Sequence, residues 1–166
     1  MSDDPSVPPV IANKLLLLRT REIDAWQLDS LLELMRDPHH EVRDWATFTV
    51  AARDDDGEEV RQALLARASD RDFDARSEAL WGLARRRDAR AIPLLIEAIG
   101  SDEVGELYVE AAAYLARPEL VAPLEALSEW WDADPSLLAE ALRRCRSEPG
   151  TGGRTWEFVP SNDPEV

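Results

Sequence analysis

His39 and His40 are the two histidines of the 166-residue sequence, and they are adjacent. Imidazole is a common metal ligand and a common general base, but a metal site needs three or four ligands that converge. No cysteine is close to this pair in sequence, because the single cysteine is Cys145. We therefore expect His39 and His40 to lie on a turn and to bind no metal.

Cys145 is the one candidate for a thiol nucleophile. A Cys–His pair would require Cys145 to lie beside one of the histidines. Cys145 instead falls in a repeated column of apolar residues, described below, which favours a buried packing role. A single cysteine also excludes an intrachain disulfide, and no Gly-rich phosphate loop follows a strand. The sequence therefore favours a protein without a catalytic centre or cofactor, and leaves an enzyme subunit open.

Charge is the most unusual property of the composition. The chain has 34 acidic and 19 basic residues, for a net charge of −15. Such a field repels the phosphate backbone, which normally binds clustered Lys and Arg, so we expect a basic protein as partner and not a nucleic acid. The leucine run from Leu15 to Leu18 is too short to cross a bilayer, and Met1 to Asp4 lack the basic start of a signal peptide. We expect a cytoplasmic protein without membrane contact.

Four segments of the sequence share one pattern, in which a turn aspartate is followed nine residues later by an alanine. These alanines are separated by 33, 32 and 30 residues, and they are Ala46, Ala79, Ala111 and Ala141. Periods of this length are typical of stacked supersecondary units. The pattern predicts an all-α fold of about four antiparallel helix pairs.

Each unit contains two helical patterns. The first helix carries apolar residues at i, i+3, i+4 and i+7, with Arg67 as a polar exception in the second unit. The second helix has an apolar residue, an alanine four residues later and another apolar residue four after that, which in the last unit is Cys145. The alanine lets the neighbouring helix approach closely. The predicted helices span residues 25–36, 40–52, 57–68, 72–86, 89–99, 104–116, 119–131 and 135–146.

The run from Arg76 to Ile99 resembles the short HEAT repeat that is also found in phycobilin lyases. The resemblance extends over residues 24–146 and implies a HEAT-like α-solenoid. We place the solenoid at residues 13–146, between a mobile tail of residues 1–12 and a flexible tail of residues 147–166. This superfamily contains enzymes, scaffolds and inhibitors, so the resemblance implies a fold more than a function.

The segments outside the repeats have two distinct compositions. Residues Ile11 to Leu18 are apolar enough to cover the end of the first repeat, as a helix or as an extended strap. A Gly-rich stretch near the C-terminus leads to Trp156-Glu-Phe158. This short motif either folds back onto the protein surface or acts as a docking peptide for a groove.

The resemblance also allows two site comparisons. Deoxyhypusine hydroxylases, which share this fold, bind two irons with His-Glu pairs on their second helices. Here Glu78, Glu110 and Glu140 occupy equivalent positions, but none follows a histidine, and the pair His40-Glu41 is out of register. HEAT-like DNA glycosylases line the concave face with basic residues, whereas this column is acidic or apolar. Both comparisons argue against a metal centre and against DNA binding.

In HEAT solenoids the second helices line the concave surface, so the resemblance places a group of aromatic and acidic residues there. We take as candidate partner-binding residues Trp45, Phe48, Glu78, Trp81, Glu110 and Glu140. Large aromatics among polar groups are typical of binding hot spots. Two alternatives stay open: the tryptophans wedge between neighbouring helices, and the acidic helix starts merely compensate helix dipoles.

The leading hypothesis is a non-enzymatic module whose concave, acidic–aromatic face binds a basic protein, with a toxin inhibitor (an immunity protein) as one concrete version. A bilin lyase-like enzyme subunit and a structural scaffold in a larger assembly are the alternatives. We further expect Arg76 to hydrogen-bond a turn aspartate, Asp37 or Asp70, and expect Trp130 in the core with Trp131 at the edge.

Overall fold

The computed structural model describes residues 26–147, and this part of the chain is helical without any strand. Its elements are α2 (Leu28–Leu34), α3 (His40–Ala52), α4 (Glu58–Arg67), α5 (Phe73–Arg85), α6 (Ala91–Ile99), α7 (Glu106–Leu115), the 3-10 helix η2 (Pro118–Leu120), α8 (Val121–Leu127) and α9 (Pro135–Arg146). The predicted all-α class is confirmed. The predicted tails lie outside the described residues, apart from Ser147.

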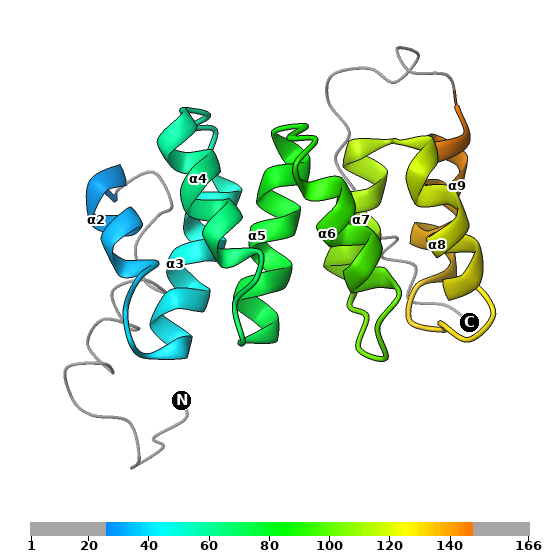
Figure 1. Ribbon diagram of the computed structural model, residues 1–166, viewed down its shortest axis with the longest axis horizontal. Helices are drawn as coiled ribbons and strands as arrows, with labels where there is room; N and C mark the ends of the chain where they lie inside the picture. The colour runs from blue at the N-terminus through cyan, green and yellow to red at the C-terminus, as the bar shows by residue number, and fades with distance from the viewer. Residues whose placement is uncertain (1–25, 148–166) are drawn as a thin grey trace, which may run out of the picture.

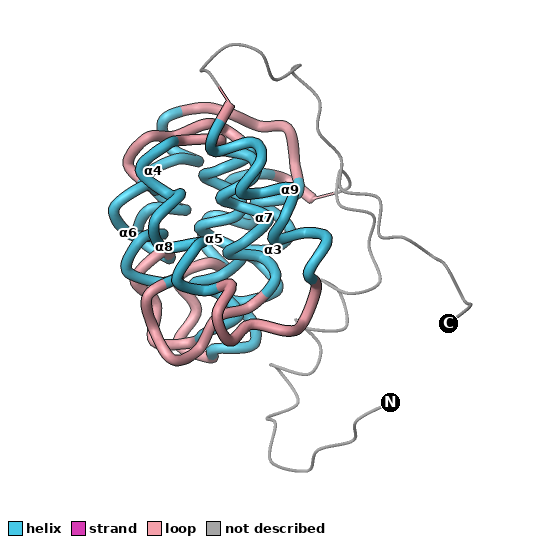
Figure 2. Tube along the Cα trace, turned by 90° about the vertical axis from the view of Figure 1, so that its right-hand side faces the viewer, coloured by secondary structure: helices cyan, strands magenta, loops and turns pink. Residues whose placement is uncertain are grey.

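The helices form two layers. Helices α2, α4, α6 and α8 make the first-helix layer, and α3, α5, α7 and α9 make the second-helix layer (Figures 1 and 2). The most extensive contacts run along the second-helix layer, from α3 to α5, from α5 to α7 and from α7 to α9. The first-helix layer is looser, since α2 and α4 make at most marginal contact. The structure is therefore a short solenoid whose second helices are packed side by side.

Small residues explain the close packing of the second helices. The four repeated alanines are all completely buried: Ala46, Ala79, Ala111 and Ala141. At Gly82 the approach is closer still, because a Cβ added there would lie 2.7 Å from the Cβ of Ala51. Real Cβ atoms do not come so near one another. The predicted alanine column therefore marks the seam between neighbouring second helices.

The buried side of the first helices is a ladder of fully buried leucines, which are Leu31, Leu64, Leu95 and Leu124. One detail of the predicted register is wrong. In the second unit the core position belongs to Ala68, while Arg67 remains half-buried and its Nη1 donates to Asp70 Oδ2 at 2.8 Å. Arg67 looked like a polar residue in the core because the buried face of α4 is shifted by one residue from the predicted register.

An ion pair joins the first two repeats at one end of the helices. Arg43 donates from Nε and Nη2 to the two carboxylate oxygens of Asp70 at 2.9 and 3.0 Å, and from Nη1 to the carbonyl of Asp37 at 3.0 Å. Burial by itself would raise the pKa of Asp70, but the bonds from Arg43 and from the backbone N–H of Asp72 lower it to about 2. The charge-assisted bonds thus outweigh the cost of desolvation.

Arg76 fulfils the predicted role in a different way. Its Nη1 donates to the backbone carbonyl of Asp70 at 2.9 Å, not to a carboxylate, and its Nε lies 3.1 Å from the hydroxyl oxygen of Tyr108 in the next repeat. The prediction of a turn-aspartate partner holds for the residue but not for the acceptor group. Arg43, one repeat earlier, forms the carboxylate pair instead.

Arg86 ties repeats together at the other end of the helices. Its guanidinium donates to five backbone carbonyls, those of Val50, Ala51, Arg53, Asp55 and Gly82, at 2.8 to 3.1 Å. Most of these carbonyls belong to the last turn of α3 or the residues after it, where no intrahelical donor remains. Arg86 therefore caps a helix of the preceding repeat.

The last repeat differs from the expectation at two tryptophans. Trp131 is buried, whereas Trp130 is 55% exposed, so the predicted assignment of these residues was the wrong way round. Helix α8 ends at Leu127, and both residues lie in the turn that follows. Within residues 26–147, no helix combines the length and apolar character needed to cross a membrane.

Candidate functional site

A cavity of about 210 Å³ opens on the second-helix layer between α3 and α5. It is lined by Asp44, Trp45, Phe48, Asp74 and Glu78, and we call it the acidic–aromatic pocket. The three residues from α3 lie within five consecutive positions and share a helix face, as do the two from α5, which are four residues apart. Trp45 and Phe48 meet edge to face, with ring centroids 5.9 Å apart. The pocket thus combines a paired aromatic wall with three carboxylates.

Electrostatic strain is concentrated at Glu78. Burial raises its pKa to about 8, and the negative charges of Asp44, Asp74 and Glu110 add to this effect. Its Oε2 atom is buried and has no hydrogen-bond partner among residues 26–147. At neutral pH a pocket that holds no cation therefore keeps Glu78 mostly protonated. A cation that enters the pocket would offset the repulsion and favour the ionised carboxylate.

Trp81 and Glu110 lie next to the pocket along the same layer. The guanidinium carbon of Arg85 sits 5.0 Å from the centroid of the Trp81 ring, a cation–π distance. Burial raises the pKa of Glu110, and the indole N–H of Trp81 partly offsets this. No acceptor among the described residues lies within hydrogen-bonding geometry of the indole nitrogen, so its contact with Glu110 is a weak one. Trp81 is partly buried and also packs against the core.

Glu140 stands apart from the other predicted site residues. Its carboxylate accepts two bonds of 2.7 Å from Arg143, which lower its pKa. The charge of Glu140 is thus neutralised within α9. The structure brings Trp45, Phe48 and Glu78 into one pocket, places Trp81 and Glu110 beside it, and leaves Glu140 outside.

Two pocket residues, Asp44 and Asp74, were not among the predicted site residues. Asp44 directly precedes Trp45, and Asp74 precedes Glu78 by four residues on the same face of α5. The spacing of Asp74 and Glu78 could have identified Asp74 from the sequence. Two like charges four residues apart destabilise a helix, so such a pair indicates a role other than helix stability.

The histidines and the cysteine have structural contacts. His40 Nδ1 lies 3.1 Å from Asp72 Oδ2, and its ring stacks on His39. Cys145 is completely buried, its Sγ lies 3.4 Å from the carbonyl oxygen of Ala112, and burial raises its thiol pKa to about 11. A thiol held in this form is a poor nucleophile. In the described part of the chain, no three potential ligands are arranged to hold a metal ion.

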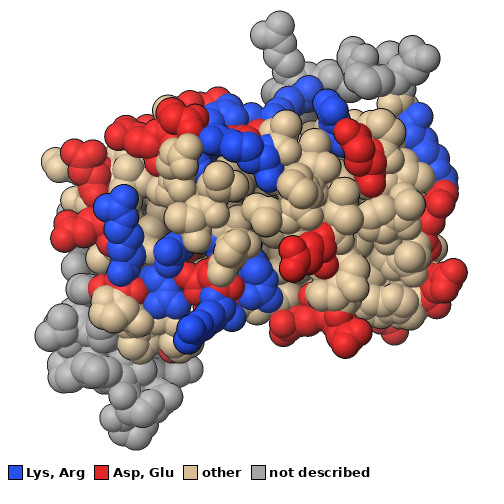
Figure 3. Space-filling model, viewed as in Figure 1, with Lys and Arg blue, Asp and Glu red and all other residues tan. Residues whose placement is uncertain are grey.

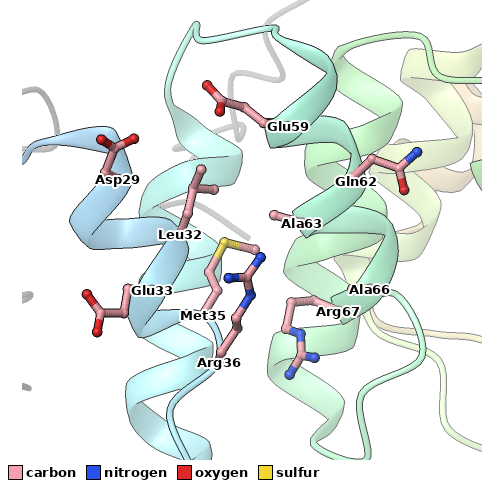
Figure 4. A pocket seen from close by; sticks show the side chains of 10 residues that line it. All are labelled: Asp29, Leu32, Glu33, Met35, Arg36, Glu59, Gln62, Ala63, Ala66 and Arg67. Atoms are coloured by element: carbon pink, nitrogen blue, oxygen red, sulfur yellow. The ribbon is translucent and has the colours of Figure 1, made fainter.

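A second, larger groove of about 660 Å³ lies on the opposite layer between α2 and α4 (Figure 4). Asp29 and Glu59 lie at one end, Arg36 and Arg67 lie toward the other, and Leu32, Met35 and Ala63 face the space between them. Acidic and basic side chains are likewise interspersed on this side of the molecule (Figure 3). The groove has a mixed lining of three acids, Asp29, Glu33 and Glu59, and two bases, Arg36 and Arg67, in contrast to the acidic–aromatic pocket.

Comparisons with known proteins agree with this architecture. A family model described as HEAT repeats matches residues 28–116. Protein YibA of Escherichia coli, strains K12 and O157:H7, is 27% identical over 116 residues, which cover 70% of this chain and 41% of YibA. The X-ray structure of YibA superposes with a TM-score of 0.64 at 27% identity, covering 72% of this chain and 44% of that one.

The chain thus spans well under half the length of these curated relatives. The matched repeats, from α2 to the end of α7, carry the acidic–aromatic pocket and three of the four seam alanines, Ala46, Ala79 and Ala111. With more than half of its residues matched by the family model, the chain belongs to the HEAT-repeat family.

Proposed function

We propose that this chain is a non-enzymatic protein-binding module, and that its acidic–aromatic pocket accepts a cationic side chain of a basic protein partner. The observation that carries the proposal is the pocket itself. Asp44, Asp74 and Glu78 line it beside the Trp45–Phe48 pair. Ring faces and carboxylates together are the groups that stabilise an ammonium or guanidinium ion.

The size and charge of the two cavities support this choice. Small-molecule sites usually have volumes of about 300–1,000 Å³, and the acidic–aromatic pocket has about 210 Å³, which suits a single side chain. A tetrapyrrole, as a bilin lyase requires, would need more space. The larger groove between α2 and α4 has Arg36 and Arg67 beside its three acids, Asp29, Glu33 and Glu59, so it selects a cation less strongly than the acidic–aromatic pocket.

The net charge of −15 supports the basic character of the partner. A strongly charged surface steers an oppositely charged protein and increases the rate of association. A toxin inhibitor of a basic nuclease is the concrete version of the proposal, with the chain in the cytoplasm. A scaffold within a larger assembly is the alternative, and it predicts a partner whose affinity does not depend on the pocket.

The test uses a partner captured from the source organism and purified, with binding followed by surface plasmon resonance. Phe48→Ala should weaken binding by about 2 kcal/mol or more, through faster dissociation, because it removes half of the aromatic wall. Trp130→Ala is the matched control, since this exposed aromatic lies at the far end of the described solenoid. Equal losses of affinity in Phe48→Ala and Trp130→Ala would contradict the proposed site.

Charge reversal gives a second, independent test on the same partner. Glu110 lies beside the pocket, so Glu110→Lys should slow association and reduce the dependence of the association rate on salt. Glu140→Lys, in the same column but outside the pocket, should change both much less, because Glu140 is already paired with Arg143. Identical association rates for these two variants would place the binding surface elsewhere.

A further inference from the structure

We propose that the groove between α2 and α4 binds an amphipathic helix of a partner protein, which lies antiparallel to these two helices and carries acidic residues in its first turn and basic residues in its last. The groove is on the layer opposite the acidic–aromatic pocket. The inference therefore goes beyond the proposed function and does not depend on it. It gives the solenoid a second binding surface with a ligand of a different kind.

The middle of the groove is apolar and has room for side chains. Leu32 and Met35 are three residues apart on the α2 side, and both line the groove. Ala63 and Ala66 have the same spacing on the α4 side. Ala66 is exposed, and Leu32 and Ala63 are half-buried, so this apolar surface is open to a partner. Alanine on one wall lets an incoming helix come close, and the volume of about 660 Å³ accommodates several of its side chains.

The charges of the groove are separated along its length. Asp29 and Glu59, each in the first turn of its helix, lie at one end, and Arg36 and Arg67 lie toward the other (Figure 4). Asp29 precedes Arg36 by seven residues, which span about 10 Å along a helix. The fifth charged residue, Glu33, has its carboxylate on the side of α2 away from α4 (Figure 4). A complementary ligand therefore has cations at one end and anions at the other.

The side chains at the two ends are available to a partner. Asp29, Arg36 and Glu59 are exposed, and none forms an ion pair or a side-chain hydrogen bond with another residue of the range 26–147. Arg67 donates to Asp70 from Nη1, and a guanidinium group has five N–H donors in all. A ligand that contacts these four groups therefore breaks no ion pair of the solenoid.

The walls of the groove select a helix as the bound conformation. An extended peptide usually gains main-chain hydrogen bonds from the edge of a sheet, and the part of the chain that the structure describes has no strand. A polyproline ligand requires aromatic walls, and no aromatic residue lines this groove. Small-molecule sites have polar groups that converge, whereas here they stand at opposite ends. A helix satisfies its own backbone and offers an apolar face to an apolar groove.

The charge pattern also sets the direction of that helix. Acids in the first turn and bases in the last turn stabilise a helix. The acidic first turn must face Arg36 and Arg67, and the basic last turn must face Asp29 and Glu59. Because α2 and α4 both begin at the acidic end of the groove, the bound helix runs opposite to them. About three turns, or roughly ten to twelve residues, cover the span between the charged ends.

Two synthetic peptides of one composition test the charge pattern. The forward peptide has two Glu at its start, Leu and Ala at helical spacing in the middle and two Arg at its end; the reverse peptide exchanges the Glu and the Arg. A hydrocarbon staple on the polar face keeps both helical, which circular dichroism verifies. We expect the forward peptide, labelled with fluorescein and followed by anisotropy, to bind the full-length chain at least tenfold more tightly. Each exposed pair contributes little, but the exchange reverses the sign of four contacts together.

Variants of the chain locate the binding to the groove. R36E/E59R keeps the net charge but leaves one acid and one base at each end, so it should reduce the preference to less than twofold. R87E/E97R is the matched control, at two exposed residues outside the groove, and should keep the preference. Ala66→Trp should fill the groove and weaken the forward peptide at least tenfold, whereas Trp at the exposed position of Ala89, between α5 and α6, should not.

Three results would overturn the proposal. The first is equal affinity of the two peptides for the wild-type chain, or no binding of either at millimolar concentration. The second is binding that R36E/E59R and Ala66→Trp leave unchanged. The third is a dimer in sedimentation velocity that Ala66→Trp abolishes, because a second copy of the chain would then occupy the groove. Phe48→Ala, which tests the proposed function, should not change peptide binding, so either proposal can fail without the other.

Discussion

Asp70 is the carboxylate at which the first two repeats meet, and Asp70→Asn removes its charge while keeping its shape. The side chain is 4% exposed and accepts bonds from Arg43 at 2.9 and 3.0 Å and from Arg67 at 2.8 Å. An amide has one acceptor oxygen and no charge, so it cannot reproduce the paired bond from Arg43. We expect this substitution to lower the free energy of unfolding by an amount that depends on pH.

The size and sign of that dependence follow from the pKa. Folding lowers the pKa of Asp70 from 3.8 to about 2, so the folded state binds fewer protons than the unfolded state. Its stabilising contribution is complete above the unfolded value and is lost as the pH falls through 3.8 toward 2. A shift of about 1.8 units at 1.36 kcal/mol per unit gives an upper value of about 2.4 kcal/mol. Solvent screening at this edge of the molecule reduces the expected value to about 1–2 kcal/mol.

The assay is urea unfolding at a series of pH values from 6.5 to 2.5. The stability difference between wild type and Asp70→Asn should shrink by about 1–2 kcal/mol over the acid end of this range. Asp102→Asn is the matched control, because Asp102 occupies the equivalent turn one repeat later and is exposed. Its curve should run parallel to the wild-type curve. A parallel curve for Asp70→Asn as well would refute the assignment of the pKa shift to the pair with Arg43.

Two further substitutions test the ties between repeats by the same unfolding assay. Gly82→Ala should lower the free energy of unfolding by about 1–3 kcal/mol, because the added Cβ would lie 2.7 Å from the Cβ of Ala51. Gly57→Ala is the control and should lower it by less than about 1 kcal/mol, because the added Cβ would meet only the flexible side chain of Glu59. Similar losses in the two variants would show that the seam can relax. Arg86→Met should lower the free energy of unfolding by about 3 kcal/mol or more, because five backbone carbonyls lose their donor. Arg87→Met, at an exposed position, is the control. Equal stability of the two variants would contradict the capping role of Arg86.

The helices and their order could be predicted from the sequence because the alanine period and the helical period are both local. The buried face of α4 was less certain, since alanine fits a core or a surface and the stem of arginine can cover apolar surface. This is why Arg67 was read as a core position that Ala68 in fact occupies. Trp130 and Trp131 were assigned wrongly because α8 ends at Leu127, earlier than predicted, and a turn changes which side a residue faces.

The candidate site was predictable only in part, for a different reason. Periodicity puts Trp45, Phe48 and Glu78 on one side of their helices, and the resemblance to HEAT solenoids predicted that this side lines the concave surface. Whether two helices bring such residues to one pocket depends on their axial offset and separation. Those quantities are set by packing at Gly82 and Ala51, which the pattern of either helix alone does not show.

The contrast between the two layers has a mechanical consequence. The second helices are in close contact through alanine and glycine, and such packing resists compression. The first helices α2 and α4 are instead separated by an open groove. When a stiff layer is joined to a compliant one, deformation is taken up mainly by the compliant layer. Flexing of this solenoid should therefore change the width of the groove between α2 and α4. The spacing between α3 and α5, and with it the width of the acidic–aromatic pocket, should stay nearly constant.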